Sequence, residues 1–270
     1  MQPKSDQIII VIAVLTLLGY SGTVQQSITS LRASEIPPRQ TLSVKGHAAF
    51  IMMPSKADSK SPQPWVWYAP TLPRYPEARE NWMFEKFLAA GIAIAGIDVG
   101  ESYGSPDGRR IYSAFYKELV TNRRFAPKAA LLARSRGGLM LYCWACENPD
   151  SVACIAGIYP VCDLRSYPGL DKACGAYGLT RAELEKQLDQ HNPVARLAPL
   201  ARAGVPIFHI HGDVDKTVPL NENSGEVARQ YKLLGGKMEL KIAPGARAQR
   251  LGRVLSVSGA GRLCHCPIHT

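Results

Sequence analysis

The chain has 270 residues, 46% of them hydrophobic and 20% charged, with a formal net charge of +10 at pH 7. This globular composition excludes collagen-like, disordered and disulfide-scaffold proteins, since seven cysteines are too few for a small disulfide framework. Four arginines and no acid lie between residues 244 and 270, but no basic run is interleaved with aromatics, so we expect no nucleic-acid partner.

The N-terminus has the pattern of an export signal. Lys4 precedes the apolar run IIIVIAVLTLL at 8–18, and small residues follow at plausible cleavage positions. The run is shorter than the ~20 residues that span a bilayer comfortably. Residues 1–22 are therefore predicted to be a signal peptide, with an uncleaved N-terminal anchor or a buried element as alternatives, and residues 23–40 a polar lead-in. We expect an exported protein, periplasmic or secreted, that meets a membrane only through such an anchor.

From residue 41 onward, short apolar strands alternate with helices. The run IAIAGIDV at 92–99 is apolar throughout, as in strands that are buried on both faces. The predicted strands are 41–53, 65–69, 92–99, 128–133, 153–159, 206–211 and 238–242, and the predicted helices are 81–90, 111–120, 137–148, 180–190 and 224–234. This alternation predicts an α/β domain over 41–245, with a mostly parallel central sheet and helices on both faces.

Residues 163–205 form an insertion before the strand at 206–211. Thr180 and Glu183 have the spacing of a capping box, which predicts a helix over 180–190. We expect the insertion above the carboxyl edge of the sheet, either as a small lid over a site or as a plain excursion of the chain.

Two serines have the local sequence of a nucleophile elbow, a sharp turn between a strand and a helix that exposes the serine hydroxyl. Ser102 lies in a literal G-x-S-x-G, GESYG at 100–104, and Ser135 lies in ARSRGG at 133–138. The residues SPDG at 105–108 predict a turn after Ser102, whereas the strong helix sequence LMLYCWACEN follows Ser135. Because the amino end of that helix helps to stabilise an oxyanion, we assign the nucleophile to Ser135 and a loop role to Ser102.

A second motif, HGDVDKTVP at 211–219, follows the strand predicted at 206–211. Together with ARSRGG it resembles the α/β-hydrolase fold, most closely its prolyl oligopeptidase-like branch of serine hydrolases, over roughly residues 65–245. In that branch the second aspartate of H-G-x-x-D-x-x-V-P is the triad acid. The resemblance therefore implies Asp215 as the acid, with Asp213 as the rival carboxylate.

A triad also needs a histidine to accept the serine proton. The resemblance implies one in a P-G-x-G-H segment after the last strand, but this chain has PGARAQ at 244–249. The six histidines lie elsewhere, at His47, His191, His209, His211, His265 and His269. His209 is expected in the core and His211 in a structural role within the acid motif. His265 would replace the base only if the tail folds back, and its Cys-His-Cys surroundings lack the spacing of a zinc site.

The basic tail, residues 246–270, is atypical of the fold, because it has no acid and no helical stripe. We hypothesise that the reading frame shifts near Arg247. Codon degeneracy permits GHNVWAGFFQCQELVDFVIA from Arg247 onward in the shifted frame, which restores a Gly-His and an amphipathic closing helix. The nucleotide sequence tests this hypothesis, because a stop codon or the lack of a histidine codon in that frame would exclude it.

The resemblance also implies an oxyanion hole made of the backbone N–H of Arg136 and that of Thr71 or Leu72, since Pro70 has no N–H to donate. Arg134 and Arg136 flank the serine, where they either attract an anionic substrate or form salt bridges to the insertion.

The cysteines and glycines indicate no cofactor. Cys143 and Cys146 form a C-x-x-C inside a predicted helix, which favours packing over redox chemistry. In an exported protein Cys154, Cys162 and Cys174 could form one disulfide, with the pairing left open. No G-x-G-x-x-G or Walker pattern is present, so no nucleotide cofactor is expected. No metal is expected either, because the Cys-His-Cys string of the tail lacks the spacing of a zinc site.

The sequence therefore predicts an exported serine hydrolase that forms an acyl-enzyme on Ser135, with Asp215 as the triad acid and a small ester or a peptide as substrate. The alternatives are a catalytically inactive hydrolase-like protein, with a binding role or none, and a surface-interaction module that uses the basic tail.

Overall fold

A computed structural model describes residues 38–246 apart from 56, 58 and 59. The predicted signal peptide, nearly all of the lead-in, and the tail with its hypothesised frameshift and His265 lie outside the described residues. In the described part of the chain, no helix is both long and apolar enough to cross a membrane.

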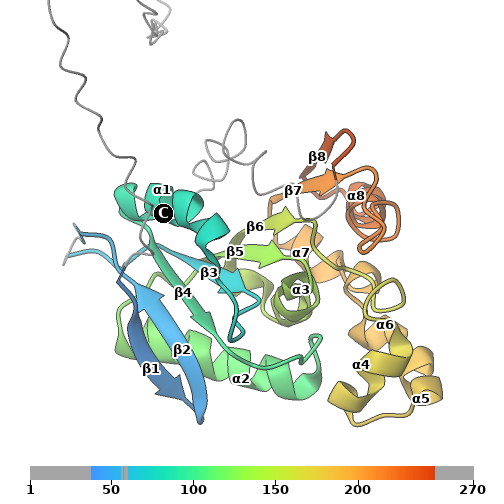
Figure 1. The fold of residues 1–270 in the computed structure, drawn as a ribbon, viewed down its shortest axis with the longest axis horizontal. Coiled ribbons are helices and arrows are strands. Elements are labelled where there is room, and N and C mark those ends of the chain that lie inside the picture. Colours follow the sequence, from blue (N-terminus) through green and yellow to red (C-terminus); the bar gives the residue numbers. More distant parts are fainter. Residues whose placement is uncertain (1–37, 56, 58–59, 247–270) are drawn as a thin grey trace, which may run out of the picture. The chain divides into compact units, whose positions relative to one another are not determined.

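The core of the domain is one eight-stranded sheet (Figure 1). The strands are β1 (Gln40–Val44), β2 (His47–Met52), β3 (Trp65–Ala69), β4 (Ala93–Ile97), β5 (Ala129–Arg134), β6 (Val152–Ile158), β7 (Ile207–Gly212) and β8 (Met238–Ala243). Their order is β1-β2-β4-β3-β5-β6-β7-β8. Only the pairings β1–β2 and β2–β4 are antiparallel. The predicted mostly parallel α/β sheet is confirmed.

Helices cover both faces of the sheet. The helices are α1 (Asn81–Ala89), α2 (Pro106–Lys117), α3 (Gly137–Glu147), α4 (Leu170–Tyr177), α5 (Arg181–Lys186), α6 (Leu188–His191), α7 (Ala198–Arg202) and α8 (Ser224–Leu233). Short 3₁₀ turns lie at Ala78–Glu80, Pro149–Ser151 and Pro193–Ala195, and a π turn lies at Glu118–Asn122. Side chains of α1 pack on one face, and those of α2, α3, α7 and α8 pack on the other.

Strand β3 shows how one strand serves both layers. Its side chains alternate, as those of a strand must, and all are buried. Trp67 faces α2 and α3, with its ring 4.9 Å from that of Tyr112 and 4.8 Å from that of Trp144. Tyr68 faces the other way, 5.4 Å from the ring of Phe84 in α1. Burying aromatic side chains of this size stabilises the fold by about 1.5–3 kcal/mol each.

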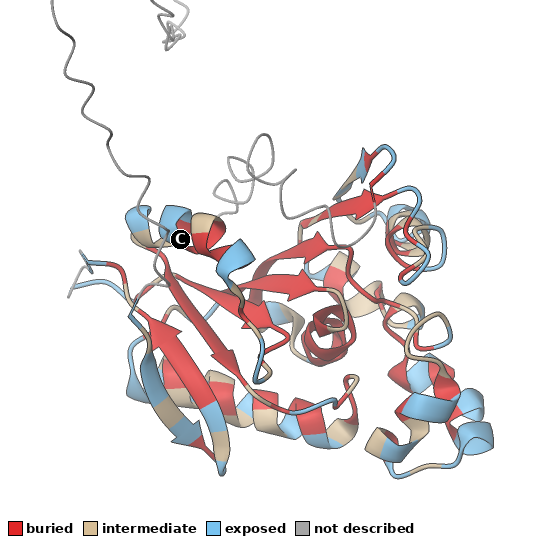
Figure 2. Ribbon diagram, in the orientation of Figure 1, coloured by how far each residue is buried: buried red, intermediate tan, exposed pale blue. Residues whose placement is uncertain are grey.

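Helix α3 is buried on every side from Gly137 to Cys146 (Figure 2). It lies against the sheet and is also covered by α2 and α7. Its uniformly apolar sequence follows from this position, because a helix that is covered all round has no polar face. The residue that precedes this helix is therefore held on a rigid support.

Two elements predicted before residue 121 differ from the structure. The strand predicted over 41–53 is a hairpin, because Lys45 and Gly46 form a two-residue loop with φ of 53° and 83°. The helix predicted over 111–120 begins at Pro106, so the predicted turn at 105–108 is wrong. The Ser105 hydroxyl accepts the N–H of Gly108 as an N-cap, and Pro106 occupies the first turn.

The insertion contains α4 to α7. The predicted capping box is present at Thr180 and Glu183, but the helix ends at Lys186 and resumes as α6. Apolar side chains of the insertion pack with Leu139 of α3 and Val218, which follows β7. This contact places the insertion at the carboxyl edge of the sheet, as predicted.

Candidate active site

Ser135 occupies the sharp turn between β5 and α3. Its φ is 50°, in the left-handed region that costs a residue other than glycine about 1–3 kcal/mol. The turn is held by the N–H of Ser135, which donates to Ile158 O at 3.1 Å, and by its carbonyl, which accepts from Gly138 and Val161. A rigid, strained turn of this kind presents the serine side chain at the edge of the sheet.

The two glycines after Ser135 allow the chain to pass closely by its neighbours. A Cβ on Gly137 would lie 2.2 Å from Ala69 O and 2.5 Å from Pro70 N, and one on Gly138 would lie 2.3 Å from Val161 O. No side chain fits at such distances. The start of α3 is therefore fixed against the end of β3, which brings Pro70 beside Ser135.

A cavity of about 360 Å³ opens in front of Ser135. The described residues that line it are Pro70, Tyr75, Glu77, Arg79, Arg134, Ser135, Arg136, Tyr159, Thr217 and Val218. Thr217 and Val218 belong to the loop that follows β7, which carries Asp215. The two motifs singled out in the sequence thus meet at one cavity, although 80 positions separate them.

Asp215 is buried, with 7% of its surface exposed. Its Oδ1 accepts the N–H of Thr217 at 2.9 Å and that of Val218 at 3.0 Å. Its Oδ2 is buried and has no hydrogen-bond partner among the described residues. One carboxylate oxygen is thus anchored to the backbone and the other is free to orient a neighbouring group.

Asp213 differs from Asp215 in position and exposure. It is exposed, and its Oδ1 accepts the N–H of Gly245 at 2.7 Å, which ties the end of β7 to the turn after β8. Ala246 lies against Gly212, because a Cβ on that glycine would be 2.0 Å from Ala246 O. The chain therefore reaches residue 246 directly beside the motif that carries Asp215.

None of the four histidines in the described part of the chain lines the cavity. His47 Nδ1 lies 3.0 Å from Asp98 O, and His191 is a buried residue of the insertion at the end of α6. His209 and His211 are fully buried in β7. Burial lowers the pKa of His209 to about 3 and also lowers the pKa of His211, so both rings are neutral near pH 7.

Comparisons with known proteins show which family and which solved structures this chain resembles. Residues 114–247 match the family described as the prolyl oligopeptidase family. This stretch of the α/β domain is therefore similar to the prolyl oligopeptidase family. The matched segment contains Ser135 and Asp215 and ends where the atypical tail begins. No curated protein sequence matches the chain.

Solved structures share the hydrolase fold at low sequence identity. Porphyromonas gingivalis dipeptidyl peptidase 4 has a TM-score of 0.67 at 15% identity, over 85% of this chain and 35% of its own. Pyrococcus horikoshii acylaminoacyl peptidase has a TM-score of 0.61 at 17% identity, over 84% of this chain and 39% of its own. A candidate carboxylesterase from Lactobacillus plantarum has a TM-score of 0.61 at 16% identity, over 84% of this chain and 95% of its own. The chain thus spans little more than a third of the length of the two peptidases.

The arginines that line the cavity at Ser135 are paired. Arg134 is buried, forms an ion pair with Glu80, donates from Nε to the Tyr159 hydroxyl at 2.8 Å and lies 5.0 Å from the Tyr75 ring. Burial raises the pKa of Glu80, although the charge of Arg134 opposes this. A buried pair of this kind is costly to break, because one unpaired charge would remain.

Arg136 and Arg79 have carboxylate partners as well. Arg136 pairs with Glu101 and lies 5.9 Å from the Tyr167 ring, and Arg79 pairs with Glu77 at 2.5 Å. No ion-pair partner of the three arginines lies in the insertion, so the predicted bridges to 163–205 are not observed within the described residues. These pairs leave the cavity without a free cation from its arginines.

The insertion does not cover the cavity. None of its residues is among the described residues that line it, and its contact with the elbow is that of Tyr167 with Arg136. Of the two roles considered for the insertion, the structure therefore favours an excursion packed beside the site over a lid.

The predicted oxyanion donors lie near the elbow. Arg136 is the residue before α3, and Pro70 lines the cavity beside it. The N–H of Leu72 donates to Tyr75 O at 3.4 Å, within a turn of the loop after β3. Thr71 is buried next to it and bridges to Asp98.

Ser102 lies away from the cavity although it has the literal G-x-S-x-G. It is 8% exposed, and its Oγ lacks a partner among the described residues. A Cβ on Gly108 would lie 2.6 Å from this Oγ. The hydroxyl is thus sealed against the first turn of α2, where no substrate reaches it.

Sequence reasoning missed several residues of the cavity wall. Tyr159 could have been found, because it follows β6 at the carboxyl edge of the sheet, where site residues gather. Tyr75 and Glu77 come from the irregular loop before α1, and Arg79 comes from the 3₁₀ turn at Ala78–Glu80. No pattern in the sequence marks these three residues.

The cysteines contribute packing. Cys143 and Cys146 are buried free thiols on α3, and burial raises the pKa of Cys143 to about 11. Cys154 is disulfide-bonded, whereas Cys162 and Cys174 are free thiols. The disulfide predicted among these last three cysteines is therefore wrong.

Proposed function

We propose that this chain is a serine hydrolase that acts on small esters or amides. The observation that carries the proposal is Ser135, held at a positive φ between β5 and α3, at a cavity that Thr217 and Val218 of the Asp215 loop also line. In the proposed reaction the Ser135 oxygen attacks the carbonyl carbon, and its proton passes to a base. The tetrahedral intermediate then expels the alcohol or amine and leaves an acyl group on Ser135, which water removes.

The other roles follow from position. The backbone N–H groups of Arg136 and Thr71 are the proposed donors to the oxyanion. The free Oδ2 of Asp215 is the proposed partner of the base, whose ring it would orient. We infer that the base comes from beyond residue 246, because the described histidines lie elsewhere and the chain arrives there beside Asp215. The candidates are His265 and the histidine of the shifted frame.

A small ester is the substrate class that we favour over a peptide. The cavity of about 360 Å³ suits a compact acyl group. The chain matches 95% of the length of a candidate carboxylesterase, but only 35–39% of the dipeptidyl and acylaminoacyl peptidases. The paired arginines give no reason to prefer an anionic ester.

A fluorophosphonate probe, which reacts with activated serines, tests the proposal. Two chains are compared: the sequence as it stands, and a frame-restored chain in which 247–266 is replaced by GHNVWAGFFQCQELVDFVIA. We expect rapid labelling of the frame-restored chain, abolished by Ser135→Ala and retained in Ser102→Ala. If the base is the histidine of the shifted frame, labelling of the chain as it stands should be slower by on the order of 10³ or more. Equal labelling of the two chains would instead assign the base to His265.

Two results would count against this function. Labelling that survives Ser135→Ala would assign the nucleophile to another residue. A frame-restored chain that unfolds cooperatively but is not labelled would indicate the alternative, an inactive hydrolase-like protein.

We also propose export, on the basis of the leader-like sequence at 1–22. The mass of the mature protein, isolated from its native cells, tests this. Loss of about 22 residues would support a cleaved signal, and an intact N-terminus in the membrane fraction would support an anchor. An intact chain in the cytoplasm would contradict both.

A further inference from the structure

Four buried side chains form a continuous series of hydrogen bonds behind the candidate site. The Tyr142 hydroxyl on α3 lies 2.7 Å from His209 Nε2, and His209 Nδ1 lies 2.9 Å from Ser224 Oγ. The same Ser224 Oγ lies 2.8 Å from His211 Nδ1, and His211 Nε2 lies 2.8 Å from Val218 O. All four side chains are 0% exposed, so water does not substitute for any member.

The direction of every bond in this series follows from one end. Val218 O can only accept, so His211 must carry its proton on Nε2. A neutral ring has one N–H, so His211 Nδ1 accepts the single hydroxyl hydrogen of Ser224. The Ser224 oxygen then accepts from His209 Nδ1–H, and His209 Nε2 accepts from the Tyr142 hydroxyl. Burial, which lowers the pKa of both histidines, keeps both rings neutral, as this pattern requires.

The series ends at the peptide that holds the acid. Val218 accepts from His211 through its carbonyl and donates through its N–H to Asp215 Oδ1 at 3.0 Å. The other end, Tyr142, lies on the helix that begins two residues after Ser135. The hydrogen bonds thus connect the support of the nucleophile with the loop of the acid.

We propose that Ser224 and His211 are positioning residues that fix the Asp215 loop relative to Ser135, and that His209 and His211 are held as opposite neutral tautomers. The kinetic part of this inference rests on the proposed serine hydrolase function. The tautomer part stands without it, because it depends only on the buried hydrogen bonds.

Nitrogen-15 NMR of the histidine rings tests the tautomers in the chain as it stands. At pH 7 we expect His209 protonated on Nδ1 and His211 protonated on Nε2. In Tyr142→Phe, His211 should keep its tautomer, because both of its own partners remain. In Ser224→Ala both rings should change their shifts. The same tautomer on both histidines, or a doubly protonated ring at pH 7, would overturn the proposal.

The rate of fluorophosphonate labelling at Ser135 tests the positioning role. In the frame-restored chain, Ser224→Ala should lower the labelling rate constant by about tenfold to a hundredfold, since small misplacements of catalytic groups cost this much. Ser224→Thr, which keeps the hydroxyl, should restore most of the rate. Unchanged labelling in a folded Ser224→Ala chain would refute the role. If the parent itself is not labelled, the proposed function fails, whereas the NMR result still decides the hydrogen-bond series.

Discussion

At the scale of single residues, the site depends on positions where only one kind of side chain fits. Ser135 adopts a positive φ, and Gly137 comes closer to the end of β3 than any side chain allows. This close packing is the reason why small residues surround the serine in the sequence. The first small residue of the motif around Ser135 is Ala133 rather than glycine. A search for a literal G-x-S-x-G therefore finds Ser102 and passes over Ser135.

A methyl group at Gly137 should destabilise the domain. Its Cβ would meet the backbone of Ala69 and Pro70 at 2.2–2.5 Å, and backbone cannot move aside as a flexible side chain can. We expect Gly137→Ala to lower the free energy of unfolding by about 3 kcal/mol in urea titrations. The matched change Gly175→Ala, in α4 with open space around it, should raise stability by about 0.5–1 kcal/mol. Equal effects of the two changes would contradict the packing.

His209 should make stability depend on pH. Its pKa is about 3 in the folded chain and 6.5 ordinarily, so between these values the unfolded chain binds a proton that the folded chain does not. Its contribution is full above about pH 6.5 and is lost as the pH falls toward 3. Between pH 7 and 5, the stability advantage of the wild type over His209→Gln should shrink by about 2 kcal/mol in urea unfolding. Parallel pH curves for the two proteins would exclude a buried neutral ring.

At the scale of elements, local sequence predicted where most strands and helices lie but not how they end. Strands β3 to β8 and helices α1, α3 and α8 occur within a few residues of their predicted positions. The start of α2 was missed because Ser105-Pro106 is compatible both with a turn and with a helix N-terminus. The hairpin between β1 and β2 was missed because lysine is an unusual residue at the positive φ that this loop requires.

The presence of lysine at a positive φ in the hairpin loop can be tested directly. Lys45→Asn creates an Asn-Gly pair, and asparagine tolerates positive φ better than lysine does. We expect the free energy of unfolding to rise by about 0.5–1 kcal/mol. The same exchange at Lys232, exposed within α8, should lower it by a few tenths, because asparagine is the weaker helix former. Thermal and urea unfolding of both variants measure the contrast, and destabilisation by both would refute the assigned loop conformation.

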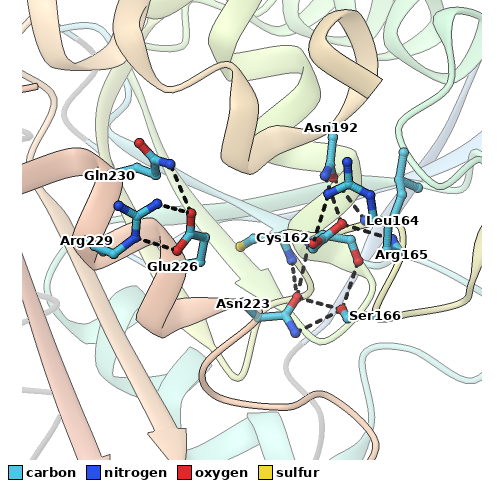
Figure 3. A network of polar contacts seen from close by, with 10 residues as sticks. Cys162, Leu164, Arg165, Ser166, Asn192, Asn223, Glu226, Arg229 and Gln230 are labelled. Atoms are coloured by element: carbon cyan, nitrogen blue, oxygen red, sulfur yellow. Dashed lines mark hydrogen bonds and ion pairs between the residues drawn. The ribbon is translucent and has the colours of Figure 1, made fainter. Parts of the chain in front are cut away.

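At the scale of the whole domain, one buried side chain joins segments that are distant in sequence (Figure 3). Asn223 Oδ1 accepts the N–H groups of Cys162 and Asp163, and its Nδ2 donates to Pro219 O and to the Ser166 hydroxyl. The segment after β6, the insertion and the end of the acid loop therefore share one amide group.

Removing that amide should loosen all three segments together. Asn223→Ala would leave two buried N–H groups and one carbonyl without this partner, so we expect a loss on the order of 3 kcal/mol or more. Gln230→Ala, which removes an amide from the outer part of α8, should change stability by less than about 0.5 kcal/mol. Urea unfolding measures both, and hydrogen exchange should show faster exchange across 163–192 in Asn223→Ala. Equal stability of the two variants would show that the network contributes nothing.

The sequence by itself was enough to predict the α/β architecture and to locate the two motifs, because both depend on residues that are close together along the chain. Apolar runs specify strands that are covered on both faces, and small residues around Ser135 specify a turn that must pass its neighbours closely. The tertiary structure decided which groups share the cavity and how each charge is paired. The pairing of Arg134 with Glu80, and the series from Tyr142 to Val218, join residues that only the crossing of helices over a sheet brings within hydrogen-bond distance. No local pattern encodes such contacts, because their partners lie tens of residues apart along the chain.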